Sequence, residues 1–133
     1  MKLTTQSEYS LLALLYLARN YGDNYISLSS ITKRHHLPFK YMERLMHVMT
    51  KAGIISSMKG RHGGYRLAHR PEEITIAEII RLMDGPLAPI GSVSRYFYKP
   101  TVIDKEKKLI KIMKNIRDYI SSKLESTTLK DIC

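Results

Sequence analysis

Cysteine is nearly absent from this sequence, which contains only Cys133. A single thiol excludes an internal disulfide framework and any metal site built from cysteines alone. Long apolar runs are absent too: Leu11–Ala18 is far shorter than the roughly 20 residues that a membrane span needs. We therefore expect a cytoplasmic, bacterial-type protein with no part in a membrane.

Acidic residues are scarce in one stretch of the chain. The formal net charge is +10, and residues 33–70 hold nine lysines and arginines but only one acid, Glu43. The flanking segments are nearly balanced, with net charges of zero over 1–32 and +2 over 71–133. Charge concentrated in this way indicates a face that binds a polyanion. The alternative is a generally basic protein whose charges are only solvated.

The periodicity of apolar residues predicts three helices in the first half of the chain, over 6–20, 28–35 and 38–52. Thr5 and Glu8 form a capping box for the first helix, and Ser27 can cap the second. Pro38 suits the first turn of the third helix, which Gly53 should end. The buried stripe expected for the first helix is Leu11, Leu14, Leu15 and Ala18.

A β-hairpin is predicted directly after the third helix. Residues 54–58 and 65–67 have strand-like composition, and between them Gly63 and Gly64 supply the positive φ angles that a short loop needs. A short helix, a tight turn and a longer basic helix form a helix-turn-helix, to which the hairpin adds a wing.

The second half of the chain is dominated by one long helix, predicted over 104–124 and about 30 Å in length. Before it, Thr75 and Glu78 form a capping box for a helix over 76–84, and a loop over 86–103 follows. The apolar stripe of the long helix can pack on its own domain or on a second copy, and the two-fold symmetry usual for helix-turn-helix proteins favours the copy. The stripe consists of Leu109, Ile112, Met113, Ile116, Tyr119, Ile120 and Leu124.

The predicted fold is therefore mainly α with a small β-hairpin. It divides into a winged helix-turn-helix DNA-binding domain over 1–85, a connecting or effector loop over 86–103, and a dimerisation helix with a C-terminal turn over 104–133. Thr128 and Asp131 can cap that turn.

The third helix presents the first group of candidate DNA contacts. Lys40 and Arg44 lie one turn apart, so both can enter one major groove and contact phosphates or the O6 and N7 acceptors of guanine. Glu43 would be repelled by phosphate, so it either accepts a hydrogen bond from a cytosine amino group or pairs with Lys40 or His47 on a solvated face. Tyr41 is included among the candidates, although its position favours an inward orientation.

The second helix and the hairpin supply the other candidates. The second helix can bind the phosphate backbone, which positions a protein without specifying sequence, through Ser29, Ser30 and Lys33. Basic side chains at the hairpin tip can reach a flanking minor groove, whose negative potential attracts them when the groove is narrow. The tip candidates are Lys59, Arg61, His62 and Gly63. Arg66 and Arg70 are interpreted as ordinary surface charge.

No arrangement for catalysis or metal binding stands out. Adjacent His35 and His36 point apart, and the remaining histidines, His47, His62 and His69, lack the spacing of metal ligands. The sequence contains no nucleophile elbow, phosphate-binding loop or inward-facing pair of carboxylates. It therefore predicts a protein that is not an enzyme and has neither a metal nor a cofactor.

Several segments together resemble one known family. They are Tyr41-Met42-Glu43-Arg44-Leu45, Lys59-Gly60-Arg61-His62-Gly63-Gly64-Tyr65-Arg66-Leu67-Ala68, Ile74-Thr75-Ile76-Ala77-Glu78-Ile79-Ile80 and Gly85-Pro86-Leu87. On these segments the chain resembles the IscR/NsrR/CymR-type (Rrf-two) family of winged helix-turn-helix regulators, over nearly its whole length. The resemblance implies a homodimeric transcriptional regulator with the helix from Pro38 in the major groove, the hairpin in the minor groove and the long helix in the dimer.

The resemblance also identifies a departure. Cluster-binding members of the family carry three cysteines in the loop before the long helix, whereas residues 86–103 contain none, and Ser92 and Thr101 stand roughly at those places. Hydroxyls do not replace thiolates as iron–sulfur ligands, and Cys133 alone cannot hold a cluster within one chain. We therefore expect no iron–sulfur cluster.

The leading prediction is a sequence-specific DNA-binding transcriptional regulator, expected to be a repressor, that binds double-stranded DNA as a homodimer on a palindromic operator. A small-molecule or protein effector is left open: residues 86–100, with Ile90 and Tyr96-Phe97-Tyr98, either line a pocket or simply pack, and Cys133 is either a thiol switch across a dimer or a free thiol. The alternative function is a basic module that uses the same cationic face to bind a protein or RNA.

Overall fold

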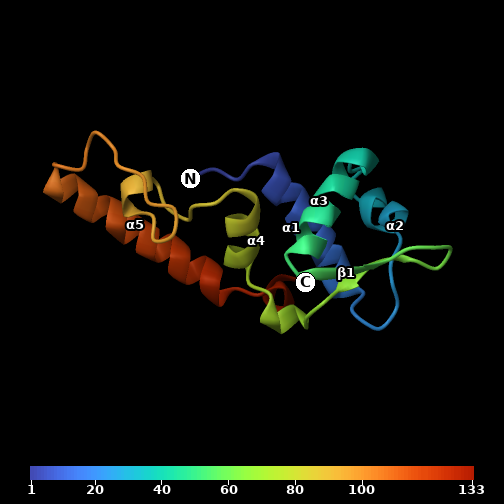
Figure 1. Cartoon of the computed structure of the whole chain (residues 1–133). Helices are drawn as coiled ribbons and strands as arrows, with labels where there is room; N and C mark the ends of the chain where they lie inside the picture. Colours follow the sequence, from blue (N-terminus) through green and yellow to red (C-terminus); the bar gives the residue numbers. More distant parts are fainter.

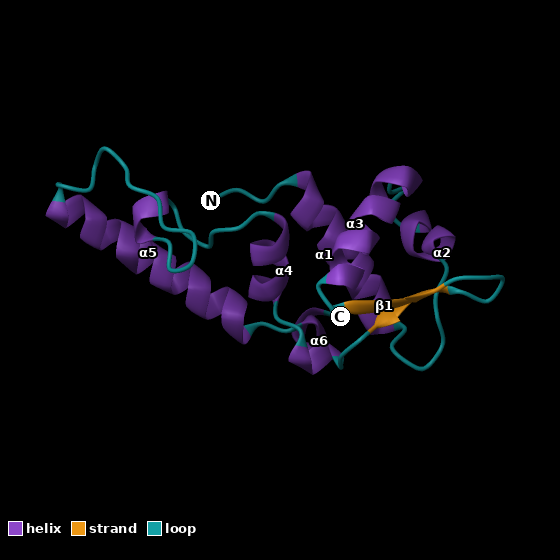
Figure 2. Cartoon of the chain, viewed as in Figure 1, coloured by secondary structure: helices purple, strands orange, loops and turns teal.

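A helix-turn-helix with a two-stranded hairpin forms one end of the structure, and the longest helix extends toward the other end (Figure 1). The computed structural model describes all 133 residues. Its elements are α1 (Thr5–Arg19), α2 (Leu28–Lys33), α3 (Phe39–Lys51), β1 (Ile55–Met58), β2 (Gly64–Leu67), a 3-10 turn η1 (Pro71–Glu73), α4 (Ile76–Met83), a second 3-10 turn η2 (Gly91–Val93), α5 (Lys107–Ser126) and α6 (Leu129–Ile132). The mainly helical fold with one antiparallel hairpin confirms the predicted fold class (Figure 2). None of the helices combines the length and apolarity of a membrane span.

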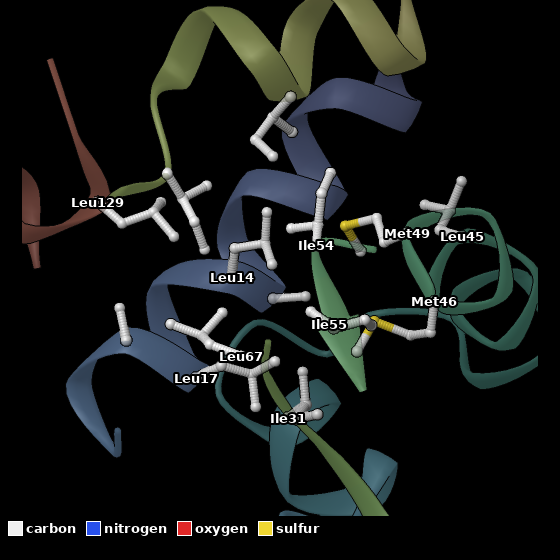
Figure 3. Close-up of a cluster of buried hydrophobic side chains, with 14 of the residues drawn as sticks. Leu14, Leu17, Ile31, Leu45, Met46, Met49, Ile54, Ile55, Leu67 and Leu129 are labelled. Carbon is white, nitrogen blue, oxygen red and sulfur yellow. The ribbon is translucent and has the colours of Figure 1, made fainter. Parts of the chain in front are cut away.

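The core is built around α1, which packs against α3, α4 and α6 (Figure 3). Its buried residues are Ser7, Ser10, Ala13, Leu14, Leu17 and Ala18. The predicted stripe is correct for Leu14 and Ala18, whereas Leu11 and Leu15 are only partly buried. Neighbouring elements cover α1 from several sides, so its small residues are buried where other helices approach closely.

The amphipathic helix α3 completes this core. Its buried residues are Met42, Leu45, Met46 and Met49. Full burial of side chains of this size stabilises a fold by about 1.5–3 kcal/mol each, which fixes the helix on the core and leaves its opposite face in solvent. The helix begins at Phe39, one residue later than predicted, because Pro38 is its N-cap and lies outside the first turn.

The start of α1 is held differently from the predicted capping box of Thr5 and Glu8. Thr4 is the N-cap residue, and its side chain does not cap the helix. Instead the backbone N–H of Thr4 donates to Asp84 Oδ2 at 3.1 Å, and its hydroxyl donates to the other oxygen of this carboxylate. Partial burial raises the pKa of Asp84, but these hydrogen bonds outweigh it and hold the pKa below its ordinary value. The start of α1 is thereby tied to the end of α4.

Two other helices have limits that differ from the prediction. The second helix, α2, ends at Lys33 rather than at residue 35, because the chain turns there and His36 adopts a left-handed conformation with φ 52°. The long helix α5 begins at Lys107 rather than at residue 104. Here the Asp104 carboxylate accepts hydrogen bonds from the backbone N–H and the hydroxyl of Thr101, at 3.1 and 2.9 Å, and holds these residues in a turn.

The β1–β2 hairpin, hereafter the wing, is fixed to the rest of the domain through the start of β2, close to the tip loop. Its register pairs Ile55 with Leu67 and Met58 with Gly64. Beyond the hairpin, Ile26 and Tyr65 exchange two backbone hydrogen bonds of 2.8 Å each, so the segment before α2 lies beside β2. The wing is therefore attached directly to the helix-turn-helix.

The last turn of the chain belongs to the core rather than to a free end. Leu129 is fully buried and reaches the same cluster as Leu14 (Figure 3). Backbone hydrogen bonds join Ile76 N–H to the Thr127 carbonyl and Leu129 N–H to the Ile74 carbonyl, at 2.9 and 3.0 Å. The predicted cap of this turn is present, with the Thr128 hydroxyl accepting from Asp131 N–H. Cys133, directly after it, is exposed.

We expect Gly64→Ala to destabilise the fold through the attachment of the wing. A Cβ at Gly64, where φ is 151°, would lie 2.2 Å from the carbonyl oxygen of Ile26. The free energy of unfolding in urea should fall by more than about 1 kcal/mol. Gly22→Ala is the matched control, because nothing lies within 4 Å of its Cβ and its φ is not positive. Equal stability of the two variants would contradict this account of the wing.

Candidate nucleic-acid interface

A hollow of about 450 Å³ lies between the helix-turn-helix and the wing. Its walls are Ser27, Leu28 and Ser29 at the start of α2, Phe39, Glu43, His47 and Thr50 on α3, and Ser57, Met58, Lys59, Gly60, Gly63, Gly64 and Tyr65 on the wing. The hollow is open to solvent and is bounded by the two elements that the sequence predicts as DNA-reading parts.

The structure brings together part of the predicted set of DNA contacts. The residues of this set that line the hollow are Ser29, Glu43, His47, Lys59 and Gly63. Those outside it are Ser30, Lys33, Lys40, Tyr41, Arg44, Arg61 and His62. Most of this second group is exposed on the surface of α2, α3 and the wing tip, whereas Ser30 and Tyr41 are half-buried.

The helix α3, which the sequence predicts to enter the major groove, presents two distinct exposed faces. One face, with residues three or four apart, forms the wall of the hollow: Phe39, Glu43, His47 and Thr50. The adjacent face carries Lys40 and Arg44, both exposed and one turn apart. Phe39 and Thr50 were not among the predicted contacts, although their spacing from Glu43 and His47 places them on the same side.

Five wing residues of the hollow are also outside the predicted set, and the two with large side chains are Met58 and Tyr65. Met58 is an exposed apolar side chain at the end of β1, opposite Gly64. Tyr65 lies on β2 beside Ile26. The side of a strand on which a residue lies depends on pairing register, which the sequence of one hairpin does not specify strongly.

Glu43 is a free carboxylate in this structure. It forms no salt bridge, so the alternative in which it pairs with Lys40 or His47 is not what the structure shows. The charge of Glu43 acts on Tyr65, which lines the same hollow from the wing. Partial burial raises the pKa of the Tyr65 phenol, and the negative charge of Glu43 raises it further. Glu43 is therefore available as a hydrogen-bond acceptor.

Tyr41 lies behind the exposed face of α3. Its ring meets the ring of Tyr9 on α1 edge to face, with centroids 5.9 Å apart and planes at 87°. The guanidinium carbon of Arg44 lies 5.1 Å from the centroid of the Tyr41 ring. The side chain thus contacts α1 on one side and a basic residue of α3 on the other.

The start of α2 is held by Ser27, its N-cap residue, and by Ser30 in its first turn. The Ser27 side chain caps the helix by accepting from Ser30 N–H at 3.2 Å, and the two hydroxyls lie 2.9 Å apart. Ser29 is exposed and makes no such bond. The hydroxyl of Ser29 is therefore the freer of the two predicted phosphate ligands.

Two arginines of the basic segment are engaged within the chain. The Arg66 guanidinium stacks 4.4 Å over the ring of Tyr25 and donates to the carbonyl of Asp23. Arg70 pairs with Glu72 and Glu73 at the start of η1. Arg66 therefore connects β2 to the segment before α2 and is more than ordinary surface charge, whereas the exposed Arg70 agrees with that interpretation.

The loop before α5 folds on itself and on the helix. The Ser92 and Thr101 hydroxyls lie 3.2 Å apart, and hydrogen bonds from Ser92 and Thr101 lower the pKa of Asp104. Arg117 on α5 donates to the carbonyl of Val93 at 3.0 Å, while Arg95 pairs with Asp118. The aromatic run is mainly exposed, but the Arg81 guanidinium carbon lies 4.9 Å over the Tyr96 ring, and Tyr98 lines a pocket of about 190 Å³ with Ser92, Asp104, Ile110 and Lys114.

Comparison with known proteins accounts for this architecture. A family model named Rrf2, described as an iron-dependent transcriptional regulator, matches residues 3–133. The chain belongs to the Rrf2 family. The HTH-type transcriptional regulator CymR of Bacillus subtilis strain 168 is 33% identical over 132 residues, which cover 99% of this chain and 89% of CymR. The family resemblance predicted from the sequence is confirmed.

Solved structures agree with this assignment. The structure titled as CymR, the global cysteine regulator of B. subtilis, matches with a TM-score of 0.86 and 32% identity, covering 99% of this chain and 95% of that one. IscR of T. potens matches with a TM-score of 0.70 and 32% identity, covering 99% and 85%. The chain is a DNA-binding transcriptional regulator of the winged helix-turn-helix type.

The donor set does not fit the iron that the family description names. Iron–sulfur clusters are held by cysteine thiolates, and the one thiol of this chain, Cys133, lies at the end of α6 and not in the loop. The loop offers hydroxyls and one carboxylate that are already bonded to one another. No group of three His, Cys, Asp or Glu side chains converges anywhere in the structure. The loop of this member has the chemistry of a packed turn.

We expect anaerobically purified protein to lack the visible sulfide-to-iron absorption of a cluster, because thiolate ligands are missing. The measurement is an absorption spectrum taken together with an iron and sulfide assay. A family member with three cysteines in the loop before the long helix, purified in the same way, is a suitable positive control. Stoichiometric iron and sulfide with a visible band in this protein would contradict the prediction.

Proposed function

We propose that this chain is a homodimeric repressor that reads a palindromic operator, with α3 in the major groove and the wing in the adjacent minor groove. One observation carries the proposal: the basic side chains of the DNA-reading elements make no ion pair within the chain. They are Lys33, Lys40, Arg44, Lys59 and Arg61, whereas the ion pairs of the structure involve other residues. Free cations of this kind displace counterions from phosphates, which drives association with DNA.

The residues divide between positioning and reading the DNA. Phosphate contacts come from α2, through Ser29, Ser30 and Lys33. Base edges in the major groove are read from α3 by Lys40, Glu43, Arg44 and His47. The wing tip enters the minor groove with Lys59, Arg61, His62 and Gly63. Glu43 excludes bases that present only acceptors, because an unpaired carboxylate accepts from a cytosine amino group and repels an acceptor.

The apolar face of α5 supports the homodimer. Its own chain leaves this face uncovered, with Ile112 54% and Tyr119 75% exposed. Together with Leu109 and Ile116 these residues recur at intervals of three and four, the spacing of a helix–helix seam. A shallow apolar groove of about 290 Å³ formed by Leu3, Ile120 and neighbouring residues adjoins the seam. A second copy of the chain would cover both.

Three consecutive segments of the chain have different proposed roles. Residues 1–85, completed in the core by Leu129 of α6, form the DNA-binding domain. Residues 86–103 connect it to α5 and form the segment on which a small-molecule or protein effector would act, and residues 104–133 contain the dimer helix. Repression requires only that the bound dimer occupy a promoter. We infer a role in the bacterial cytoplasm and no catalytic activity.

Selection of genomic fragments on the wild-type protein tests the function directly. We expect an enriched palindrome with half-sites about one helical turn apart, bound at least about 10³-fold more tightly than random duplex. Since the related CymR is titled a cysteine regulator, fragments upstream of genes that handle cysteine are the first to inspect. Transcription of the linked genes should rise when the protein is deleted. Equal affinity for all duplexes, or tighter binding to structured RNA, would contradict the proposal.

The wing is tested by Lys59→Ala and Arg61→Ala. Each substitution should weaken binding to operator and random duplex alike, and each should reduce the slope of log affinity against log salt by about 1. Fluorescence anisotropy titrations at several salt concentrations measure both quantities. Lys108→Ala is the control, because this exposed lysine lies on α5, far from the wing (Figure 1). If neither wing variant differs from this control, the wing does not contact DNA.

The dimer is tested by the double variant Ile112→Glu/Ile116→Glu. Two carboxylates in an apolar seam should raise the dimer dissociation constant by at least about 100-fold. Asn115→Glu/Ser122→Glu adds the same charge at exposed polar positions of α5 and should leave the dimer unchanged. Sedimentation equilibrium gives the constants. A wild-type monomer at concentrations that occupy the operator would show the seam assignment to be wrong.

A further inference from the structure

The recognition helix carries two exposed cations on one face, but their surroundings differ. The Arg44 guanidinium carbon lies 5.1 Å from the centroid of the Tyr41 ring. Lys40, one turn earlier, has no aromatic partner and no ion pair. A planar guanidinium stacks on an aromatic face, whereas an ammonium on a flexible stem behaves as a point charge. Only the arginine is therefore held in a defined place.

The Tyr41 ring is also contacted on the side of the core. Tyr9 on α1 contacts it edge to face, with centroids 5.9 Å apart and an interplanar angle of 87°. Both tyrosines are partly buried against the core cluster. Aromatic pairs prefer this arrangement because the positive edge of one ring meets the negative face of the other. A continuous stack thus runs from α1 through Tyr41 to Arg44.

Such a stack matters for reading a base. A free arginine loses much rotamer freedom when it is immobilised on a ligand, and that loss opposes binding. Bidentate contact with guanine O6 and N7 also needs a defined orientation of the guanidinium plane. An aromatic ring beneath the guanidinium restricts the side chain before DNA arrives.

We propose that Tyr41 is a positioning residue that holds the Arg44 guanidinium for base readout, with Tyr9 as its support. The inference rests on the proposed function and assigns Tyr41 a role other than the DNA contact predicted from sequence. Arg44 then reads one base pair in each half-site from a defined orientation, whereas Lys40 reaches the same groove without a fixed orientation. Tyr41 changes the readout only through Arg44.

The experiment is a selection from a randomised duplex library, made separately with the wild-type protein and with variants. Arg44→Ala should remove the base preference at one position of each half-site. Tyr41→Leu should reduce the preference at that same position by about two- to five-fold, the range expected for loss of an exposed cation–π contact. Tyr41→Phe keeps the ring and should keep the preference. In the Arg44→Ala background, Tyr41→Leu should have no further effect.

A second pair of variants separates positioning from general stability. Tyr9→Leu removes the ring that supports Tyr41 without changing Tyr41 or Arg44, and it should weaken the same base preference as Tyr41→Leu. Tyr16→Leu is its matched control: Tyr16 is another half-buried tyrosine of α1 that packs on the core outside the stack. Thermal melts should place both α1 variants below the wild type in stability, with altered base preference in Tyr9→Leu alone.

Several results would overturn the inference. One is a uniform loss of affinity in Tyr41→Leu at every position, which indicates a merely structural residue. Another is an equal effect of Tyr41→Leu with and without Arg44, or loss of preference in Tyr41→Phe, which indicates direct contact of the tyrosine with DNA. If the wild-type protein itself selects no sequence, the proposed function fails and not the stack alone. If Tyr41→Leu does not fold, the Tyr9→Leu and Tyr16→Leu pair decides.

Discussion

Two backbone hydrogen bonds between Ile26 and Tyr65 connect the two walls of the candidate DNA-binding face. They lie at the point where the chain enters α2 and where β2 begins, so they join the helix-turn-helix to the wing. Gly64 allows this contact, because any side chain at that position would overlap the Ile26 carbonyl. These bonds, together with the contacts of Arg66 to Asp23 and Tyr25, hold the wing beside the helix-turn-helix and so bound the hollow between α3 and the wing. Glu43, His47 and Lys59 therefore act as one surface although they come from separate elements.

The basic residues of the chain serve two different purposes, and the structure separates them. Arg66, Arg70, Arg81 and Arg117 are bonded to carboxylates, carbonyls or aromatic rings of the chain itself. The lysines and arginines of α2, α3 and the wing tip have no acidic partner. Net charge alone does not distinguish these groups, because both contribute equally to it. The distinction identifies which cations remain available for phosphate and which maintain the shape of the protein.

Much of the fold could be predicted because its signals are local. The cap at Ser27, the position of Pro38 and the glycines of the wing each act within a few residues, and the helix-turn-helix with its hairpin follows from them. Of the two glycines predicted to have a positive φ, Gly64 has one and Gly63 does not, and Gly60 is the other wing glycine with a positive φ. The contacts that were missed join distant segments. Thr4 bonds to Asp84, Tyr9 meets Tyr41, and Leu129 fills the core beside α1.

The candidate site was likewise predictable where its signals are local and not where it depends on contacts between distant segments. The exposed positions of α3 follow from helical periodicity, so the set around Glu43 and His47 was accessible from the sequence. The orientation of Met58 and Tyr65 depends on strand register, and the role of Tyr41 depends on a ring contributed by α1. Periodicity indicates which face a residue occupies. Periodicity does not indicate which residue of another element contacts that face.

The return of the chain into the core at Leu129 has a mechanical consequence. The long helix is connected to the DNA-binding domain at both of its ends, through residues 86–103 on one side and through α6 on the other. These two connections restrict how far the long helix can move relative to the rest of the domain. In the proposed dimer, two such helices would set the distance between the two copies of α3. Such a dimer would select operators by the separation of their half-sites as well as by the bases within each half-site.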